Sequence, residues 1–251
     1  GTPVVSPNQD IVLGCFYMSQ FSEPKSGTMR AYGSDEEAIM AYQTGNLHIQ
    51  ERLILLIKGE KVETNVGRIL FNQILPESLR YTNKLLDKKT LTSLISRSLA
   101  GDGLERTVLL LDDIKKLAFN YLTNSGVSWG MDDLPLPPQK KEILAVAEKE
   151  VEQIHQLYQD GLLTDMERRV KVIKVWTLVR EHITELSKGV LDPLGPVYSM
   201  IASGARGSWA QITQMMGMKG MVTNPAGETI ELPVKASFKE GLDVLEYFIS
   251  T

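Results

Sequence analysis

The sequence is poor in the residues that build disulfide frameworks and metal centres. It holds a single cysteine, Cys15, and three histidines in 251 residues. One cysteine cannot form an internal disulfide, and so low a content is typical of proteins from a reducing compartment. The histidines, His48, His155 and His182, do not have the spacing of metal ligands, so we predict no metal site within this chain.

The sequence also lacks the signatures of several function classes. It has no P-loop, no nucleophile elbow and no dinucleotide-binding fingerprint. It shows no signal peptide and no apolar run of membrane-spanning length. The net charge is −4, so the total charge does not indicate nucleic-acid binding. These observations predict a cytoplasmic, soluble protein with no membrane partner.

Acidic residues are missing from one long stretch towards the C-terminal end. Residues 193–227 contain no Asp or Glu, and their only charges are Arg206 and Lys219. Arg206 stands between Gly204 and Gly207, where the lack of side chains lets a large anion approach the backbone. A guanidinium offers a planar set of donors to phosphate or carboxylate oxygens. Two interpretations stay open here: an anion site, or a glycine turn whose arginine is solvated.

Two long helices are predicted within residues 139–189. Apolar residues recur at spacings of three and four along both helices. Gly161 ends the first helix, and Thr164 with Glu167 forms a capping box for the second. The short connection predicts an antiparallel helical hairpin about 30–35 Å long. The apolar stripe of the second helix is expected to consist of Val170, Ile173, Trp176, Val179, Ile183 and Leu186.

The connection between these helices is a candidate docking site. The hairpin carries nine Lys or Arg and nine Asp or Glu, and this balanced charge favours a surface that faces protein rather than nucleic acid. Leu162 and Leu163 at the connection are the candidate docking residues. A local helix-cap contact is the alternative role for both.

The first half of the chain mixes helices with a few strands. Ser34 and Glu37 form a capping box for a helix that Gly45 ends. Strands are expected over residues 47–57 and 61–76, around a turn at 58–60. Arg68 in the second of these strands is either a ligand arginine or an anchor at a strand edge.

Two more helices are expected before the hairpin. One begins at Lys88 and Lys89, and the other covers residues 109–122. In the second of these helices the side chains expected to be mostly buried are those of Ile114, Leu117, Phe119 and Tyr121.

The C-terminal stretch predicts three short elements. Residues 211–218 form a helix, and residues 219–234 form a hairpin around a turn at 224–227. Ser237 and Glu240 make a capping box that starts a last helix. That helix has no stop signal, so we expect the polypeptide to be cut from a longer one.

Together these elements predict a fold that is mainly α with small β elements (α+β). It combines the long antiparallel helical hairpin with a mixed α/β region. A stretch rich in Gly, Pro and Asp follows Asn124 and marks a boundary near Ser125. The predicted domains are residues 1–124, 125–202 and 203–251.

Several motifs resemble the largest (beta-prime) subunit of bacterial DNA-directed RNA polymerase. They are SGARGSWAQITQMMGMKGM from Ser203, TNPAGETIELPV from Thr223 and SFKEGLDVLEYFIST from Ser237, with NVGRILFNQILP and DGLLTDMERRVKVIKVW upstream. The resemblance identifies residues 1–124 as a pore region and 125–202 as a funnel region with a rim helical hairpin. Residues 203–251 would hold a substrate-contacting arginine, an active-site loop and the start of the bridge helix.

The resemblance implies a part in RNA synthesis from a DNA template by a nucleotidyltransferase. The segment would line the secondary channel through which nucleoside triphosphates reach the reaction centre. Arg206 would contact their phosphates, and Lys219, Asn224 and Pro225 would belong to the active-site loop. Transcription factors that use the channel would dock on the rim hairpin, at Leu162, Leu163, Glu167 and Lys171.

The implied partners are the beta, alpha, omega and sigma subunits, together with template DNA and RNA. The assembled enzyme would use Mg²⁺, and the full subunit Zn²⁺, with all ligands outside this chain. The family's aspartate triad for magnesium is absent from the sequence, so no catalytic residue is expected here and the fragment should be inactive alone.

Departures from the family pattern limit what is carried over. Thr213 and Lys219 stand where the family usually has arginine. Val170 replaces an Asn and Lys116 a Tyr, which leaves open whether sites for alarmone nucleotides are kept. The alternative function is an autonomous protein-binding module built on the helical hairpin.

Overall fold

The computed structural model describes residues 5–24, 27–57 and 59–250. It divides into two compact units, one from residues 1–128 and 198–206 and the other from 129–197 and 207–251. Helices predominate in both, and the described strands form one small sheet, so the predicted fold class is confirmed. No helix in the described ranges is both long and apolar enough to cross a membrane.

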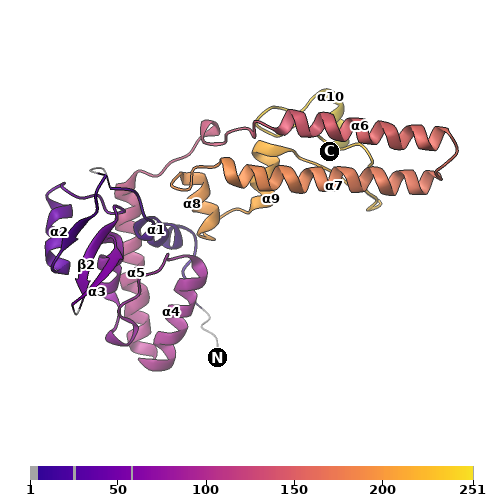
Figure 1. Cartoon of the computed structure of the whole chain (residues 1–251). Coiled ribbons are helices and arrows are strands. Elements are labelled where there is room, and N and C mark those ends of the chain that lie inside the picture. The colour runs from indigo at the N-terminus through magenta and orange to yellow at the C-terminus, as the bar shows by residue number, and fades with distance from the viewer. Residues whose placement is uncertain (1–4, 25–26, 58, 251) are drawn as a thin grey trace. The chain divides into compact units, whose positions relative to one another are not determined.

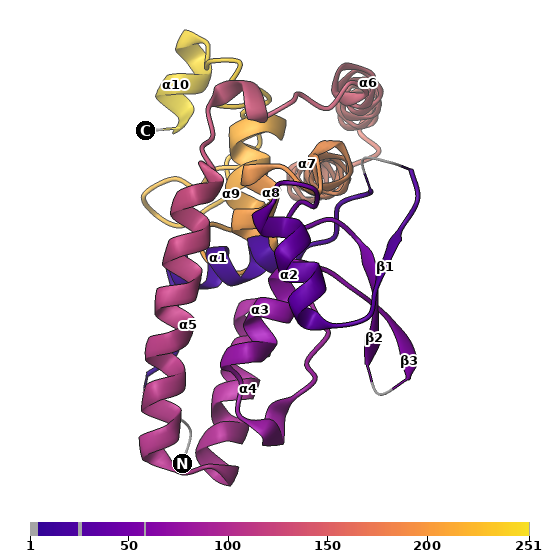
Figure 2. The same cartoon turned by 90° about the vertical axis from the view of Figure 1, so that its left-hand side faces the viewer.

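In the described ranges, the first unit combines five α-helices that lie wholly within it with a three-stranded sheet (Figure 1). Its helices are α1 Gln9–Ser19, α2 Asp35–Gln43, α3 Val66–Ile74, α4 Lys88–Gly101 and α5 Leu104–Ser125, with a 3-10 turn η1 Glu77–Leu79. Its strands are β1 Arg30–Tyr32, β2 Leu53–Ile57 and β3 Glu60–Thr64. Figure 2 shows the strands side by side, with β1 parallel to β2 and β2 antiparallel to β3.

Helix α1 approaches two other helices unusually closely. A Cβ added to Gly14 would lie 2.4 Å from the carbonyl oxygen of Ala118 in α5, and one added to Gly67 in α3 would lie 2.0 Å from that of Met18. Only glycine leaves room for such contacts between backbones. Around them lie two clusters of buried apolar side chains, one between α1, α4 and α5 and one between α1, α2 and the sheet.

The strand expected over residues 61–76 is wrong beyond Thr64. β3 ends there, and the amide oxygen of Asn65 accepts a hydrogen bond from the Arg68 backbone N–H at 2.8 Å, which caps α3. Helix α3 is buried on several sides, from Val66 to Phe71. The apolar residues of this run recur at a helical spacing, and Asn65 supplies the cap, so the sequence carried a helix signal that the strand prediction passed over.

Arg68 is therefore not an anchor at a strand edge. Its Nε donates to the carbonyl oxygen of Ser19 at 2.9 Å, its Nη1 donates to Asn83 Oδ1 at 3.0 Å, and its guanidinium lies 3.8 Å from the ring centroid of Phe21. Burial lowers the pKa of Arg68 to about 10, so it is still a cation at neutral pH. Its donors are used inside the unit, where they hold the C-terminal end of α1.

The second unit is built on two long antiparallel helices, α6 Lys140–Gln159 and α7 Asp165–Val190, which confirms the predicted hairpin. Thr164 Oγ1 accepts from the Glu167 N–H at 3.3 Å, and Glu167 Oε2 accepts from the Thr164 N–H at 2.9 Å, as the capping box predicts. Its other helices are η2 Met131–Asp133, α9 Trp209–Ile212, the π-helix Thr213–Gly217 and α10 Val244–Ser250, while α8 Pro196–Ala202 spans the boundary with the first unit.

Two burial predictions are wrong. Val170 is 61% exposed, because the buried side of α7 is formed by other residues: Val172, Val175, Trp176, Val179 and Ile183. Phe119 in α5 is 45% exposed, because α5 turns Ile114 and Ala118 towards the core instead.

The C-terminal elements differ in form from those predicted. The helix expected over 211–218 is α9 followed by the π-helix, and the hairpin expected over 219–234 has only two isolated bridges, Gly220 with Val234 and Thr223 with Thr229. The box of Ser237 and Glu240 closes a turn rather than starting a helix. Gly241 follows at a φ of +86°, a left-handed conformation that ends helical propagation, so α10 starts only at Val244.

We expect Gly67→Ala to lower the free energy of unfolding by about 1–3 kcal/mol, because its Cβ would overlap the backbone of Met18. Urea unfolding of the 251-residue chain measures this change. The control is Gly101→Ala in α4, where an added Cβ meets nothing within 4 Å. It should leave stability unchanged or raise it by up to about 1 kcal/mol. Equal effects of the two substitutions would contradict the close packing of α1 and α3.

Candidate functional site

Arg206 lies in the first unit, in a turn that follows α8. Gly204 and Gly207 on either side have φ angles of +73° and +82°, which residues other than glycine rarely adopt. The Arg206 backbone N–H donates to the Met200 carbonyl at 3.2 Å, and Ser203 Oγ accepts from the Ala205 N–H at 3.2 Å. The backbone that carries Arg206 is thus held in place.

The guanidinium of Arg206 is exposed and makes no hydrogen bond or ion pair with the described residues. All of its donors are therefore available to an anion, in contrast to those of Arg68.

A pocket of about 740 Å³ lies beside this turn within the first unit. Ser203 and Gly204 line one side, and Lys88 and Lys89 at the start of α4 line another. The Lys88 backbone N–H donates to the Ser203 carbonyl at 2.9 Å, which joins the turn to α4. These two lysines add positive charge near the turn. They are more than 100 residues away in the sequence, so no local signal could have identified them.

Lys219, Asn224 and Pro225 lie in the second unit, in a segment of residues 218–234 that packs against α7. We call it the loop segment. Met218 is fully buried in the cluster between α6 and α7, and Met221 packs against that cluster. A Cβ on Gly220 would lie 2.9 Å from Cδ of Arg180 in α7.

Two of the predicted loop residues use their polar atoms inside the unit. Lys219 Nζ donates to the Ser250 carbonyl of α10 at 3.3 Å and lies 5.4 Å from the ring centroid of Phe238. Asn224 Oδ1 accepts from the Glu228 N–H at 2.9 Å, and Asn224 Nδ2 donates to Glu228 Oε2 at 3.1 Å. Both residues therefore shape the loop segment, while Pro225 at its turn is exposed.

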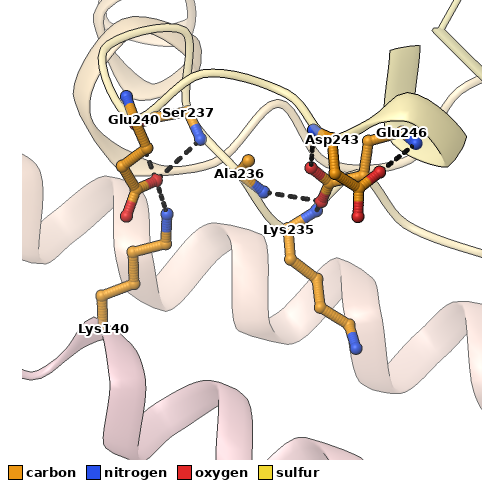
Figure 3. A network of polar contacts seen from close by, with 7 residues as sticks. All are labelled: Lys140, Lys235, Ala236, Ser237, Glu240, Asp243 and Glu246. Atoms are coloured by element: carbon orange, nitrogen blue, oxygen red, sulfur yellow. Dashed lines mark hydrogen bonds and ion pairs between the residues drawn. The ribbon is translucent and has the colours of Figure 1, made fainter.

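A network of polar contacts fixes the chain between the loop segment and α10 (Figure 3). Lys140, which is 5% exposed, pairs with Glu240, whose Oε2 also accepts from the backbone N–H and the hydroxyl of Ser237 at 2.8 Å. Partial burial alone would raise the pKa of Glu240, but the hydrogen bonds from Lys140 and Ser237 and the charge of Lys140 outweigh it. The pKa of Glu240 is therefore lowered.

Glu246 in α10 forms the second half of this network. Its Oε1 accepts from the backbone N–H groups of Lys235 at 2.9 Å and Ala236 at 3.0 Å. Asp243 Oδ1 accepts from the Glu246 N–H at 2.6 Å, and Glu246 Oε2 accepts from the Asp243 N–H at 3.3 Å, which caps α10. Neither residue was predicted from the sequence, although the D-x-x-E spacing is a recognisable capping signal.

The connection between α6 and α7 exposes an apolar surface. Leu162 is 69% exposed, whereas Leu163 is half-buried against the core of the hairpin, so the two differ in role. Met166 and Val170, one turn apart at the start of α7, are 78% and 61% exposed. We call Leu162, Met166 and Val170 the tip patch. Val170 was predicted to belong to the apolar stripe of the helix, and Met166 was not predicted to have a role. Their spacing of four residues places both on the same side of α7 and could have identified them together.

The charged residues predicted at the rim flank this patch. The Glu167 carboxylate accepts from the backbone N–H and hydroxyl of Thr164 at 2.9 and 2.8 Å, and these bonds lower its pKa. Lys171 is exposed one turn further along α7. Glu167 therefore caps the helix, and Lys171 is the charge that stays available next to the tip patch.

Comparison with known proteins places this architecture in a family. The model of RNA polymerase Rpb1, domain 3, matches residues 1–134, and that of RNA polymerase Rpb1, domain 4, matches residues 145–239. The chain belongs to the RNA polymerase Rpb1 family. The resemblance seen in its motifs is thereby confirmed.

Curated relatives agree over the whole chain. It is 43% identical to the DNA-directed RNA polymerase subunit beta' of Pelotomaculum thermopropionicum, 44% to that of Moorella thermoacetica and 41% to that of Fusobacterium nucleatum. Each match covers 100% of this chain but only 22%, 22% and 19% of the relative. The chain thus spans about a fifth of the length of these Rpb1-family subunits.

We expect Glu240→Gln to lower the free energy of unfolding of the second unit by about 1–3 kcal/mol at pH 7, because it leaves the buried Lys140 without a counter-charge. All three tryptophans, Trp129, Trp176 and Trp209, lie in this unit, so their fluorescence during urea unfolding reports on it.

The effect of Glu240→Gln should depend on pH. Since the folded pKa of Glu240 is lowered, its stabilising contribution is present above the ordinary value of 4.5 and is lost as the pH falls through the lower folded value. The difference from the unsubstituted chain should therefore shrink towards pH 3. The control is Glu142→Gln on the exposed side of α6. A difference that stays constant with pH would contradict the role of this ion pair.

Proposed function

We propose that this chain is a segment of the largest subunit of a bacterial DNA-directed RNA polymerase and takes part in RNA synthesis on a DNA template. The match to Rpb1 domains 3 and 4, together with relatives over its full length, supports this function. The segment would act as part of a nucleotidyltransferase and line the channel that brings nucleoside triphosphates to the reaction centre. We place it in the cytoplasm.

Arg206 would bind the phosphates of the incoming nucleotide. Its exposed guanidinium, with no partner among the described residues, on a turn held by glycines and backbone hydrogen bonds, carries this proposal. A cation fixed in this way stabilises negative charge as it redistributes during phosphoryl transfer without having to reorient. Lys88 and Lys89 would add to the positive potential near Arg206.

The remaining parts of the reaction belong to the assembled enzyme. The described residues contain no group of three His, Cys, Asp or Glu that could hold a metal ion. We expect the Mg²⁺ that serves the reaction, and the Zn²⁺ of the full subunit, to be bound by residues outside this sequence. The proposed partners are the beta, alpha, omega and sigma subunits, template DNA and RNA.

The tip patch supports a second role, the docking of proteins that use the channel. Three exposed apolar side chains at the connection and at the start of α7, together with the charged Lys171, make a surface suited to a protein partner. The same surface would serve an autonomous binding module, but the Rpb1 domain 4 match runs through the hairpin from residue 145 onwards, which favours docking within the polymerase.

For Arg206→Ala in the assembled polymerase, we expect the kcat/KM for nucleotide addition to fall about ten- to a hundredfold, with a higher KM. One charge-assisted contact to phosphate is lost. Single-nucleotide extension kinetics measure the effect, and Arg206→Lys should lose less because it keeps the charge. Arg97→Ala, another exposed arginine of the same unit, is the control. Unchanged kinetics with all four nucleotides would remove Arg206 from the site.

For the double variant Leu162→Asp/Met166→Asp, we expect the affinity of a transcript-cleavage factor for the polymerase to fall about tenfold or more, because carboxylates would replace the apolar contact. Titrating the factor against RNA cleavage in stalled complexes measures it. Val146→Asp is the control, since Val146 is 67% exposed on α6 away from the tip patch. Equal factor affinity in the double variant and the control would exclude the tip patch as the docking surface.

A further inference from the structure

The outer half of the loop segment is a compact turn. Within residues 222–230 the Asn224 N–H donates to the Glu228 carbonyl at 2.8 Å, and the Ile230 N–H donates to the Val222 carbonyl at 2.9 Å. Thr223 and Thr229 form a bridge, and the side chain of Asn224 pairs with Glu228. All these bonds join the turn to itself, so none of them sets its position relative to the rest of the unit.

An ionic contact attaches this turn to α7. Arg168 Nη1 donates to Glu231 Oε2 at 2.6 Å, and Arg168 Nη2 donates to Glu231 Oε1 at 3.1 Å. Arg169 Nε lies 3.0 Å from Glu231 Oε1. We call this the Glu231 clamp. Two parallel hydrogen bonds between a guanidinium and a carboxylate fix orientation as well as distance.

The clamp is partly shielded from water and supported on the helix side. The side chain of Arg168 is 13% exposed and that of Glu231 24%. Asp165 Oδ1 accepts from Arg168 Nη2 at 2.7 Å and from Arg168 Nε at 3.2 Å. These contacts within α7 fix the orientation of the guanidinium that Glu231 binds. Two arginines thus face two carboxylates, and removing the charge of Glu231 would leave an excess of positive charge at this turn of α7.

The loop segment is held at two places on α7. At its base Met218 and Met221 pack in the cluster between α6 and α7, and Gly220 lies against Arg180. At the clamp Glu231 contacts Arg168. These arginines are 12 residues apart, a distance of about 18 Å along a helix. Without the clamp the segment would be held at its base alone, by the contacts described there, by Lys219 and by Lys235, which pairs with Glu148 of α6. The turn with Asn224 and Pro225 could then swing about that base.

We propose that Glu231 is a positioning residue that holds the turn of the loop segment in a fixed place along α7. This deepens the proposed function and rests on it, since the turn matters for RNA synthesis only if it flanks the reaction centre. Glu231 touches neither nucleotide nor metal in this role. It acts through Asn224 and Pro225, whose location it determines.

The test uses the assembled polymerase with Glu231→Gln, which keeps the shape of the side chain and removes its charge. We expect the kcat of nucleotide addition to fall about tenfold, within the roughly hundredfold loss that misplacement of a group at a reaction centre can cause. Amide hydrogen exchange of residues 222–231 should become faster, while that of α6 and α7 stays the same. Glu181→Gln, an exposed glutamate of α7, is the matched control.

A conservative variant separates positioning by charge from a general loss of stability. Glu231→Asp keeps a carboxylate opposite Arg168 and Arg169, so it should recover much of the activity and exchange protection that Glu231→Gln loses. A Glu231→Asp variant no better than Glu231→Gln would overturn the proposal. So would normal kinetics of Glu231→Gln in an enzyme that Arg206→Ala impairs. If neither Arg206→Ala nor Glu231→Gln changed the kinetics, the proposed function itself would fail, whereas the exchange data would still show whether the clamp holds the turn.

Discussion

The packing of α6 against α7 is the interaction on which the second unit depends. Apolar side chains from both helices meet in one cluster, with Trp176 and Ile183 buried in it and Met218 added from the loop segment. Each helix has one apolar side and one charged side, so neither would keep its apolar residues out of water alone. Once paired, the helices present a fixed surface along which the rest of the unit is arranged.

Ionic contacts then decide where the irregular segments lie on that surface. Glu231 meets Arg168 on α7, Glu240 meets Lys140 at the start of α6, and Glu246 holds two backbone N–H groups beside α10. Ion pairs of this kind add little net stability, because removing charges from water offsets much of their attraction. Their effect is to select one position, which matters in a segment whose hydrogen bonds are otherwise internal.

The first unit shows how differently two arginines can be used. Arg68 directs its donors to backbone and side-chain oxygens and is buried over an aromatic ring, so it serves the fold. Arg206 sits on a rigid turn with its donors unused by the described residues, so it can serve a ligand. We propose that this ligand is the phosphate group of a nucleotide, a proposal that the matches to Rpb1 domains 3 and 4 support.

The sequence by itself determined the features that depend on neighbours within a few residues. The caps at Ser34 and Thr164, the helical hairpin and the fold class followed from short spacings, and the motifs from Ser203 onwards led to the family. Tertiary structure decided the rest. Val170 faces water because other residues fill the core. Glu231 and Arg168 are 63 residues apart in the sequence, and Lys140 and Glu240 are 100 residues apart. No local pattern predicts these ion pairs, because only the packing of the helices brings the paired charges close together.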